Sequence, residues 1–343
     1  KLASGMRVFW KVKVWDRKGI ASPWSEPASW RAGILSVSEW QAKWIGVDHD
    51  SSPEAMPPAP YFRKMFILEK PVRTAVLYIT ARGLLEPYLN GVRVGNDIFA
   101  PEWTDYEKRI QYRAYDVSPL LKEGGNALGM ILGDGWYSGH IGWRKERGHY
   151  GLRNSFMARL DIVYEDGAKT TVISDDTWKL SEGPILSSDF MMGEVYDARK
   201  EMPGWNTPDF NDEAWKSATV VEPPAAQLVA QPSEPVRVAE EISSISVNEP
   251  KPGVYVFDLG QNIAGWARLK AAGPAGTKVV LRFAERLNPD GSIYTANLRS
   301  AKATDTFILK GENEEVYEPH FTFHGFQYVE ATGLPSKPEP SSI

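Results

Sequence analysis

The chain has 343 residues and a net charge of −5, from 39 Lys and Arg against 44 Asp and Glu. These charges are scattered without a basic stripe, which argues against nucleic acid as a partner, and no apolar run reaches the roughly 18 residues that a membrane-inserted helix needs. Cysteine is absent, which excludes disulfides, thiolate metal sites and a cysteine nucleophile.

The first 50 residues contain one alternating run, in which Val8, Trp10, Val12 and Val14 point to the same face. Two or three strands fit in this segment, and so few strands are marginally stable in water. We therefore expect it to be the tail of a sandwich, or to pack on its neighbour. The chain does not begin with Met and its first residues do not resemble a signal peptide, so we expect a further segment upstream.

Alternation of apolar and polar residues with period two continues along the rest of the chain and predicts strands. It occurs at residues 61–68, 74–81, 110–116, 156–164, 254–259, 278–283 and 321–329. Turn signals lie between these runs at Asn90-Gly91, Asp166-Gly167 and Asp290-Gly291. Helical spacing extends over no more than single turns, near Ser118–Lys122 and Asn211–Ser217. The pattern predicts an all-β protein built from antiparallel sandwiches.

Two proline-rich stretches, residues 50–60 and 222–235, interrupt the alternation and are typical of linkers or long surface loops. They divide the chain into a leading segment at 1–50, a central domain at 51–235 and a trailing domain at 236–343. The two larger segments have sizes that suit single domains.

Several long strings resemble the bacterial α-L-rhamnosidases of glycoside hydrolase family 78, in the order that the family has them. The strings similar to the family's amino-terminal domain are YLNGVRVG (88–95), APEWTDYEKRIQYRAYDV (100–117), GDGWYSG (133–139) and GEVYDARKEMPGW (193–205). Those similar to its concanavalin-like domain are FDLGQNIAGW (257–266), RFAERLNPDGSIYT (282–295) and HFTFHGFQYVEATG (320–333). The string FWKVKVWDRKGIASPWSEPASW (9–30) resembles the end of a fibronectin-type or immunoglobulin-type module.

The resemblance implies consecutive β-sandwiches. Residues 1–50 would be the end of a fibronectin III or immunoglobulin-like module with a connecting strand, 51–235 a jelly-roll, carbohydrate-binding-like domain, and 236–343 a concanavalin-like sandwich. In the family, terminal α-L-rhamnosides are hydrolysed with inversion by carboxylates of an (α/α)6 barrel that follows this sandwich. We expect the chain to end before that barrel, to be inactive without this catalytic partner, and to act in a secreted or periplasmic protein. The alternatives are a stand-alone rhamnose-binding or glycan-binding module and a purely structural β-sandwich protein.

Two aromatic loops of the central domain are the candidates for contact with L-rhamnose-containing glycans or glycosides. Sugar rings stack on aromatic planes, and their hydroxyls form hydrogen bonds with carboxylate, amide and guanidinium groups. The first loop offers Trp103, Asp105, Tyr106 and Arg109, and the second offers Asp134, Trp136 and Tyr137, with His140 and Trp143 beyond them. In the alternative interpretation Trp103 fills a core, while Asp105 and Asp134 hold turns.

Catalytic and metal-binding residues receive little support from the sequence. Any of the 44 acidic residues could form the spaced carboxyl pair that inverting hydrolysis needs, so no catalytic pair is nominated. We expect no cofactor; the alternative is calcium, with Asp134, Asp105, Asn90 and Glu86 as oxygen donors.

Two further groups of polar residues bear on metal binding and on the domain interface. His320 and His324 are four residues apart on an expected strand, which places them about 13 Å apart and argues against zinc. Glu194, Asp197 and Arg199 lie close together and predict an Arg to carboxylate pair at a domain interface.

Overall fold

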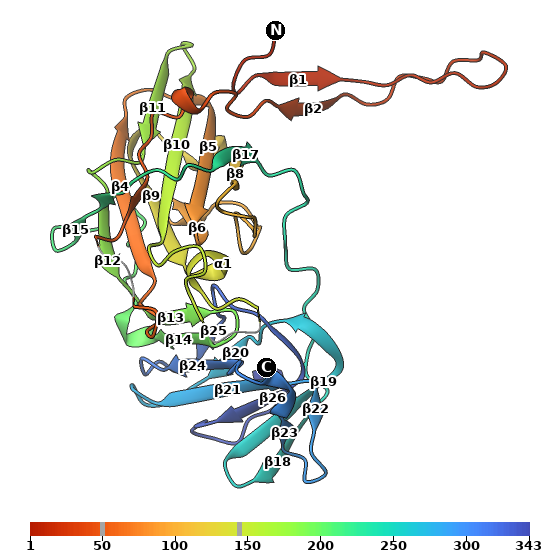
Figure 1. Ribbon diagram of the computed structural model, residues 1–343, viewed down its shortest axis with the longest axis vertical. Helices are drawn as coiled ribbons and strands as arrows, with labels where there is room; N and C mark the ends of the chain where they lie inside the picture. Colours follow the sequence, from red (N-terminus) through yellow and green to blue (C-terminus); the bar gives the residue numbers. More distant parts are fainter. Residues whose placement is uncertain (49–51, 143–145) are drawn as a thin grey trace.

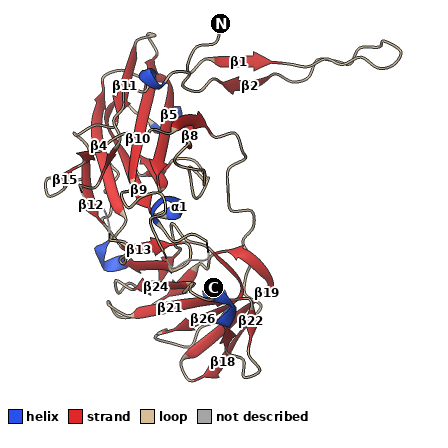
Figure 2. Cartoon of the chain, in the orientation of Figure 1, coloured by secondary structure: helices blue, strands red, loops and turns tan. Residues whose placement is uncertain are grey.

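The computed structural model describes residues 1–48, 52–142 and 146–343. The described chain is an all-β protein, as predicted (Figure 2). Its α-helix, α1 (Gly135–Ser138), is a single turn. The described 3-10 turns are η1 (Val37–Glu39), η2 (Ser118–Leu120), η3 (Ala198–Lys200), η4 (Ala296–Leu298) and η5 (Pro340–Ser342). None of the helices in this part of the chain is long and apolar enough to cross a membrane.

The central domain is a sandwich of two sheets, which form the upper body in Figure 1. The first sheet has the order β16 (Thr219–Val220), β3 (Ile45–Gly46), β10 (Ser155–Tyr164), β5 (Val72–Arg82), β8 (Arg109–Asp116) and β17 (Gln227–Ala230), with β11 (Lys169–Ile173) paired to β10. The second has the order β15 (Lys216–Ser217), β12 (Lys179–Glu182), β4 (Pro60–Leu68), β9 (Gly124–Gly133), β6 (Leu84–Leu89) and β7 (Val92–Arg93). All of these pairs are antiparallel except β8 with β17.

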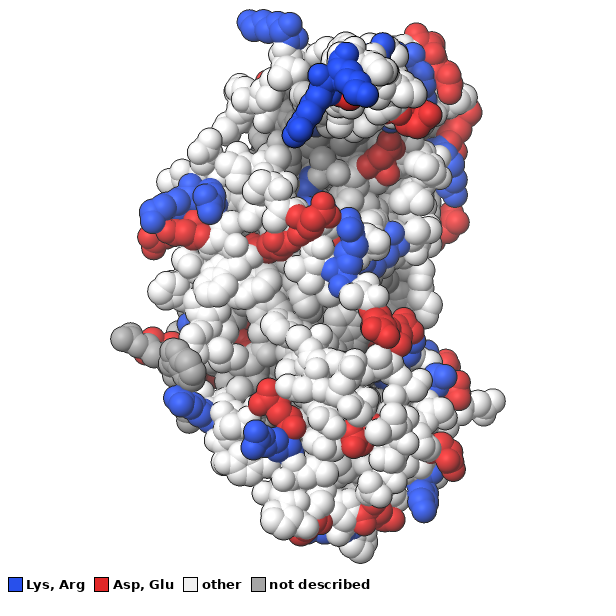
Figure 3. All heavy atoms as spheres, turned by 90° about the vertical axis from the view of Figure 1, so that its right-hand side faces the viewer, with Lys and Arg blue, Asp and Glu red and all other residues white. Residues whose placement is uncertain are grey.

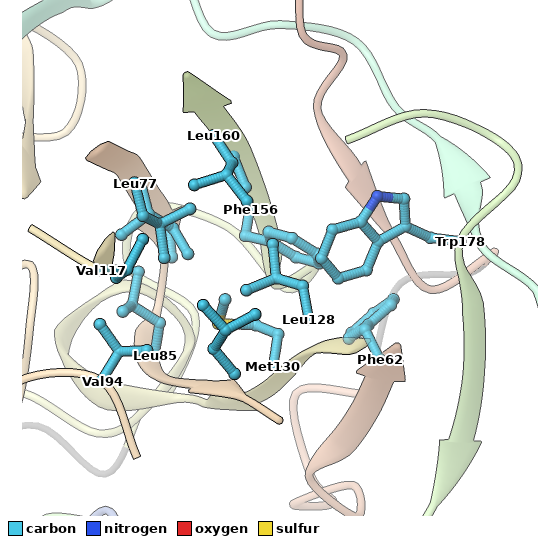
Figure 4. Packing of buried hydrophobic residues seen from close by; sticks show 14 of the residues in the cluster. Phe62, Leu77, Leu85, Val94, Val117, Leu128, Met130, Phe156, Leu160 and Trp178 are labelled. Atoms are coloured by element: carbon cyan, nitrogen blue, oxygen red, sulfur yellow. The ribbon is translucent and has the colours of Figure 1, made fainter. Parts of the chain in front are cut away.

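The core of this sandwich follows from the alternation in its strands. Phe156 and Leu160 on β10 face Phe62 on β4 and Met130 on β9, and all four side chains are fully buried (Figure 4). Trp178 closes one side, with its ring edge-on to Phe156 at 5.1 Å between centroids. Rings of this size dominate the burial of apolar area, which is the main stabilising contribution to such a core.

The trailing domain contains one large sheet and two small ones, which form the lower body in Figure 1. The large sheet has the order β13 (Ile185–Asp189), β14 (Gly193–Asp197), β24 (Thr304–Ile308), β21 (Lys278–Ala284), β26 (His324–Thr332), β19 (Val254–Gly265) and β18 (Ser246–Lys251). The small sheets pair β20 (Leu269–Ala271) with β25 (Glu315–Tyr317), and β22 (Arg286–Leu287) with β23 (Ile293–Tyr294).

The β13–β14 hairpin joins the two bodies. It precedes β15 to β17 of the central sandwich in the chain, yet β14 pairs in parallel with β24 of the trailing sheet. The contact region between the central sandwich and this trailing sheet is called the seam below. The chain itself crosses it at the hairpin.

The leading segment begins with a hairpin of β1 (Arg7–Trp10) and β2 (Ala28–Arg31) that projects from the top of the central sandwich (Figure 1). The strand predicted through Val14 stops at Trp10, and an isolated bridge joins Trp15 to Ala21. Large apolar side chains along it are exposed, including Trp15 at 63% and Ile20 at 64%. In this structure the hairpin contributes little to a buried core.

Of the other local predictions, the three turns were confirmed, one helical turn was wrong, and one predicted linker contains a strand. The three predicted turns lie in hairpins, and at Asn90-Gly91 both residues have positive φ, 52° and 87°, as a type I′ turn requires. The helical turn predicted at Asn211–Ser217 was wrong, because a reverse turn there leads into β15. The stretch 222–235 is also more than a linker, since it contains β17.

The described surface carries charges of both signs in small groups. Figure 3 shows Lys and Arg interspersed with Asp and Glu across one face of both bodies, with wide uncharged areas between them. This distribution agrees with the scattered charges of the sequence.

Candidate functional site

The seam is closed by a dense apolar cluster with members from both bodies. Tyr61, Leu84 and Ile131 of the central sandwich pack with Ile185 of the hairpin and Phe321 of the trailing domain. The approach is very close at Gly133, the last residue of β9, where an added Cβ would lie 2.4 Å from Cγ of Phe321. Only glycine leaves room for the phenyl ring at this point.

A cavity of about 330 Å³ opens along the seam and is called the seam pocket here. Its lining residues come from both bodies: Trp103, Trp136, His140, Ile141, Gly142, Phe190, Met191, Leu298, Ala301, Ala303, Phe323, His324 and Gly325. Because opposite walls belong to different domains, the pocket exists only while the seam is closed.

One wall of the seam pocket is a chain of aromatic rings. Trp103 and Trp136 are parallel within 6°, with centroids 6.2 Å apart. Trp136 packs on Phe190 at 4.6 Å, and Phe190 packs on Phe323 at 5.2 Å, which brings in the trailing domain. Trp103 is 51% exposed, so part of its indole is accessible to a ligand, and its Nε1 donates a long hydrogen bond of 3.4 Å to the hydroxyl of Tyr150.

Two histidines among the lining residues are each bound to a buried aspartate. Nδ1 of His140 lies 3.0 Å from Asp189, whose carboxylate also accepts the backbone N–H of His140 at 2.8 Å. Burial acts to raise the pKa of Asp189, but the hydrogen bonds from His140 outweigh it and lower the pKa. Nε2 of His324 lies 3.1 Å from both oxygens of Asp305. In each ring one nitrogen is held, which fixes its orientation.

Unusual backbone geometry occurs on both sides of the pocket. Phe99 and Glu102, just before Trp103, have φ of 55° and 70°, and Arg299 and Ala303 on the opposite wall have φ of 56° and 42°. Non-glycine residues rarely adopt such values, and they cluster at functional sites where packing enforces them. The carboxylate of Glu102 accepts hydrogen bonds from Gln231 and Ser233, which hold the Trp103 loop in place.

Of the predicted carbohydrate-contact residues, the structure brings Trp103 and Trp136 together in the seam pocket. Tyr106 and Tyr137 lie behind them and are buried, with their rings edge-on to each other at 5.3 Å. Burial raises the pKa of Tyr106 far above its usual value. These two tyrosines can support the indole wall but offer no free face.

The predicted polar contacts lie elsewhere. Asp105 holds a turn, as in the alternative interpretation: it accepts the backbone N–H of Glu107 at 3.2 Å and pairs with Lys108 at 2.7 Å. Arg109 is the exposed first residue of β8. Neither lines the seam pocket. Trp143 lies outside the described residues.

Asp134 is buried below α1 and does not line the seam pocket. Its carboxylate accepts hydrogen bonds from Arg147 and, at 2.8 Å, from Nδ2 of Asn154. Burial raises its pKa, although the guanidinium of Arg147 opposes this. Asp134 therefore organises the loop that carries Trp136.

The four oxygen donors considered for calcium do not fit a common site. Asp134 is bound to Arg147, Asp105 to Lys108 and Glu86 to His320, while the amide of Asn90 bonds to Asn126. Among the described residues, no group of three or more His, Asp or Glu side chains is arranged to hold a metal ion.

Sequence reasoning missed the far wall of the pocket. Phe190, Phe323 and His324 reach it from β13, β26 and the loops beside them, and no local pattern connects them to Trp103. The Arg to carboxylate pair was predicted more accurately: Arg199 pairs with Asp197 at 2.8 Å. That pair is local to one turn, however, and Glu194 is the member of the group that lies in the seam.

A larger cavity of about 450 Å³ opens at the lower end of the central sandwich. Pro57, Pro58, Glu182 and Lys216 are among its lining residues. None of its described lining residues is aromatic, which makes the seam pocket the stronger candidate for binding a sugar.

Comparisons with known proteins identify the domains of the chain. Residues 70–240 match the α-L-rhamnosidase N-terminal domain, and residues 248–343 match the bacterial α-L-rhamnosidase concanavalin-like domain. Residues 1–36 match the Rha78A-like, N-terminal immunoglobulin domain.

The similar proteins are α-L-rhamnosidases. One from Streptomyces avermitilis is 48% identical over 93% of this chain and 32% of its own length, and one from Formosa agariphila is 38% identical over 99% and 38%. The solved structure of a Streptomyces avermitilis α-L-rhamnosidase complexed with L-rhamnose superposes with a TM-score of 0.95 at 34% identity, covering 99% of this chain and 49% of that one. The structure from Dictyoglumus thermophilum gives a TM-score of 0.93 at 38% identity, covering 100% and 39%. The chain spans about a third of the length of the curated relatives it matches.

Proposed function

The chain belongs to the bacterial α-L-rhamnosidase family by its amino-terminal and concanavalin-like domains, and from this premise we propose that it is an accessory, sugar-contacting region of an α-L-rhamnosidase. In this proposal the hydrolysis of terminal α-L-rhamnosides is carried out by carboxylates outside residues 1–343. The residues of this chain bind and orient the rhamnoside, and the sandwiches support the catalytic part.

The exposed indole of Trp103, backed by Trp136, is the observation that carries the sugar-contact part of the proposal. A pyranose ring has an apolar face of C–H bonds that packs on an aromatic plane, and its hydroxyls need polar partners at the rim. His140 lines the same pocket, and Asp189 holds its imidazole through Nδ1. The imidazole of His324 is buried and stacked on Phe283, and supports the wall from inside.

The apolar remainder of the pocket favours a sugar with a methyl group. Leu298, Ala301 and Ala303 form an apolar part of the wall contributed by the trailing domain. A hydroxyl buried against this wall without a hydrogen-bond partner would be disfavoured, whereas the C6 methyl of L-rhamnose would be accommodated. L-mannose, which carries a hydroxyl at C6, is therefore the matched control sugar.

Isothermal titration of the purified chain with L-rhamnose and with L-mannose tests the proposal, together with an assay for p-nitrophenol release from its α-L-rhamnoside. We expect binding of L-rhamnose, weaker binding of L-mannose, and no release of p-nitrophenol. Trp103→Ala should weaken rhamnose binding by about fivefold or more, for a stacking contribution of about 1 kcal/mol.

Trp24→Ala is the matched control variant, because Trp24 is equally exposed, at 53%, but lies on the leading hairpin. Equal loss of affinity in both variants would argue against the seam pocket as the binding site. Release of p-nitrophenol would contradict the accessory role, and the absence of rhamnose binding would leave a supporting role for the sandwiches alone.

A further inference from the structure

Residues 320–324, with the sequence HFTFH, run along the seam and contact a different group at almost every position. His320 reaches Glu86 of the central sandwich, and Phe321 fills the apolar cluster at Gly133. Thr322 donates its hydroxyl to the backbone carbonyl of Asp189 at 2.9 Å. Phe323 and His324 then line the seam pocket. The position of one pocket wall therefore depends on how His320 is held.

The imidazole of His320 makes an ion pair across the seam. Its Nδ1 lies 3.0 Å from Oε2 of Glu86, which is on β6 and 10% exposed. The same carboxylate accepts the hydroxyl of Tyr88 at 2.9 Å and lies 3.8 Å from the guanidinium of Arg93 on β7. Among the described residues, the hydrogen-bond and ion-pair partners of this carboxylate belong to the central sandwich except His320.

A second carboxylate holds the backbone of the same residues. Glu194 on β14 is fully buried, and its Oε2 accepts the backbone N–H groups of His320 and Phe321 at 3.0 and 3.4 Å. Its Oε1 accepts the hydroxyl of Tyr317 at 3.2 Å. The ring of Tyr196 lies parallel to the imidazole of His320, with centroids 6.1 Å apart.

From these contacts we propose that His320, Glu86 and Glu194 form a proton-dependent latch, which keeps the seam and its pocket closed at mildly acidic pH and releases them at alkaline pH. The role of the latch in sugar binding rests on the proposed function of the seam pocket. The latch itself does not, because it depends only on the contact of His320 with Glu86 of the central sandwich and on the hold of Glu194 on the backbone of His320.

The charges around His320 determine the direction of the pH dependence. Burial acts to lower the pKa of His320, but the carboxylates of Glu86 and Glu194 outweigh burial and the repulsion by Arg93, and raise it to about 9. Burial also raises the pKa of Glu194 to about 7, against the effect of the positive His320. The phenols of Tyr61, Tyr88, Tyr196 and Tyr317 surround the two groups, and burial raises the pKa of each, so they remain neutral.

Both raised pKa values make the closed seam hold protons more tightly than the open one. The stabilisation from His320 is fully present below its ordinary pKa of 6.5 and is lost as the pH rises to about 9. Glu194 adds a loss of the same sign between pH 4.5 and about 7. Glu86 acts in the opposite sense. Burial acts to raise its pKa, but the charge of His320 outweighs burial and lowers it, so the stabilisation from Glu86 is lost in more strongly acidic solution.

Hydrogen exchange of the backbone amide of Phe321, corrected for its intrinsic pH dependence, measures seam opening without any ligand. Between pH 6 and pH 8.5 the wild-type chain should lose at least about tenfold in protection, since each unit of pKa difference corresponds to a tenfold change. His320→Gln and Glu86→Gln should both remove most of this loss, and His149→Gln, at an exposed histidine of the central domain, should retain it.

The variants also separate failure of the latch from failure of the proposed function. Equal pH dependence in the wild type and in both His320→Gln and Glu86→Gln would overturn the latch. A chain that shows the expected pH dependence but binds no L-rhamnose would support the latch and contradict the sugar site. Since Glu86→Gln keeps the size of the side chain and the hydrogen bond from Tyr88, it remains informative if His320→Gln does not fold.

Discussion

Replacing Gly133 with alanine should open the seam by steric force alone. The added Cβ would lie 2.4, 2.7 and 2.8 Å from Cγ, Cδ2 and Cβ of Phe321, closer than Cβ atoms approach their neighbours in folded proteins. Gly133 does not have positive φ, so the backbone itself accepts alanine. Overpacking of this kind costs about 1–3 kcal/mol of unfolding free energy.

A double-mutant cycle with Phe321→Ala assigns this cost to one contact. Phe321 is 1% exposed, so its truncation should cost about 3–5 kcal/mol. In the Phe321→Ala background the ring is gone, but Cβ of residue 321 remains 2.8 Å from the new methyl group of Gly133→Ala, so the crowding is relieved only in part. There the substitution should cost less than in the wild type, because two of its three closest contacts are removed and alanine also reduces the entropy of the unfolded chain. The expected coupling is about 0.5–2 kcal/mol.

Urea unfolding of the four proteins of the cycle, followed by tryptophan fluorescence, provides the measurement. Gly265→Ala on β19 is the matched control, since its Cβ would lie at an ordinary 3.6 Å from Ile263 and should change stability by less than about 1 kcal/mol. A Gly133→Ala chain as stable as the wild type, or an equal cost in both backgrounds, would refute the close contact between the domains.

Three further predictions follow from other parts of the structure. Arg63→Ala should lower the unfolding free energy by about 2–4 kcal/mol in urea titrations, because it removes a buried side chain and leaves the carbonyls of Trp205 and Thr207 without their donor, while Asp212 keeps Lys179; a loss below about 1 kcal/mol would contradict this. Glu194→Gln should become stabilising relative to the wild type as the pH rises from 4.5 to about 7, by about 1–3 kcal/mol between pH 5 and pH 8. Only the wild type loses stability in this range, through a carboxyl group of raised pKa; a pH-independent difference in unfolding free energy would argue against that pKa. Trp15→Ser combined with Ile20→Ser should lower self-association in sedimentation experiments, since exposed apolar side chains favour it, and unchanged sedimentation would show that the hairpin takes no part.

The sequence predicted the central sandwich best where burial alternates along a strand. In β10, Phe156, Ala158, Leu160 and Ile162 all face the core, and the period-two pattern locates this strand to within one residue. Such a pattern reflects the geometry of the strand itself, and therefore needs no knowledge of the partner strand.

The neighbouring strand β9 was missed for a physical reason. Its sequence contains Gly125, Gly129 and Gly133, which lower strand propensity and give no alternation. The structure requires small residues there, since an added Cβ at Gly129 would lie 2.8 Å from the ring of Trp205, and Gly133 faces Phe321. The reason for these glycines lies in contacts more than seventy residues away in the chain.

The candidate site could be predicted only in part for a similar reason. The aromatic loops point to Trp103 and Trp136, but nothing local distinguishes them from Tyr106 and Tyr137, which face inward. The opposite wall depends on where β26 begins. A strand was predicted from Phe321, whereas β26 begins at His324, and the irregular backbone before it lets Phe321 enter the core while Phe323 lines the pocket.

The central claim, that the seam pocket contacts sugar, is tested most directly by nuclear magnetic resonance of the indole N–H groups during titration with L-rhamnose. The account predicts saturable shifts for Trp103 and Trp136, and none for Trp178, which is fully buried in the central core. Shifts confined to other indoles, such as Trp24 on the leading hairpin, or no shifts at saturating sugar, would contradict it.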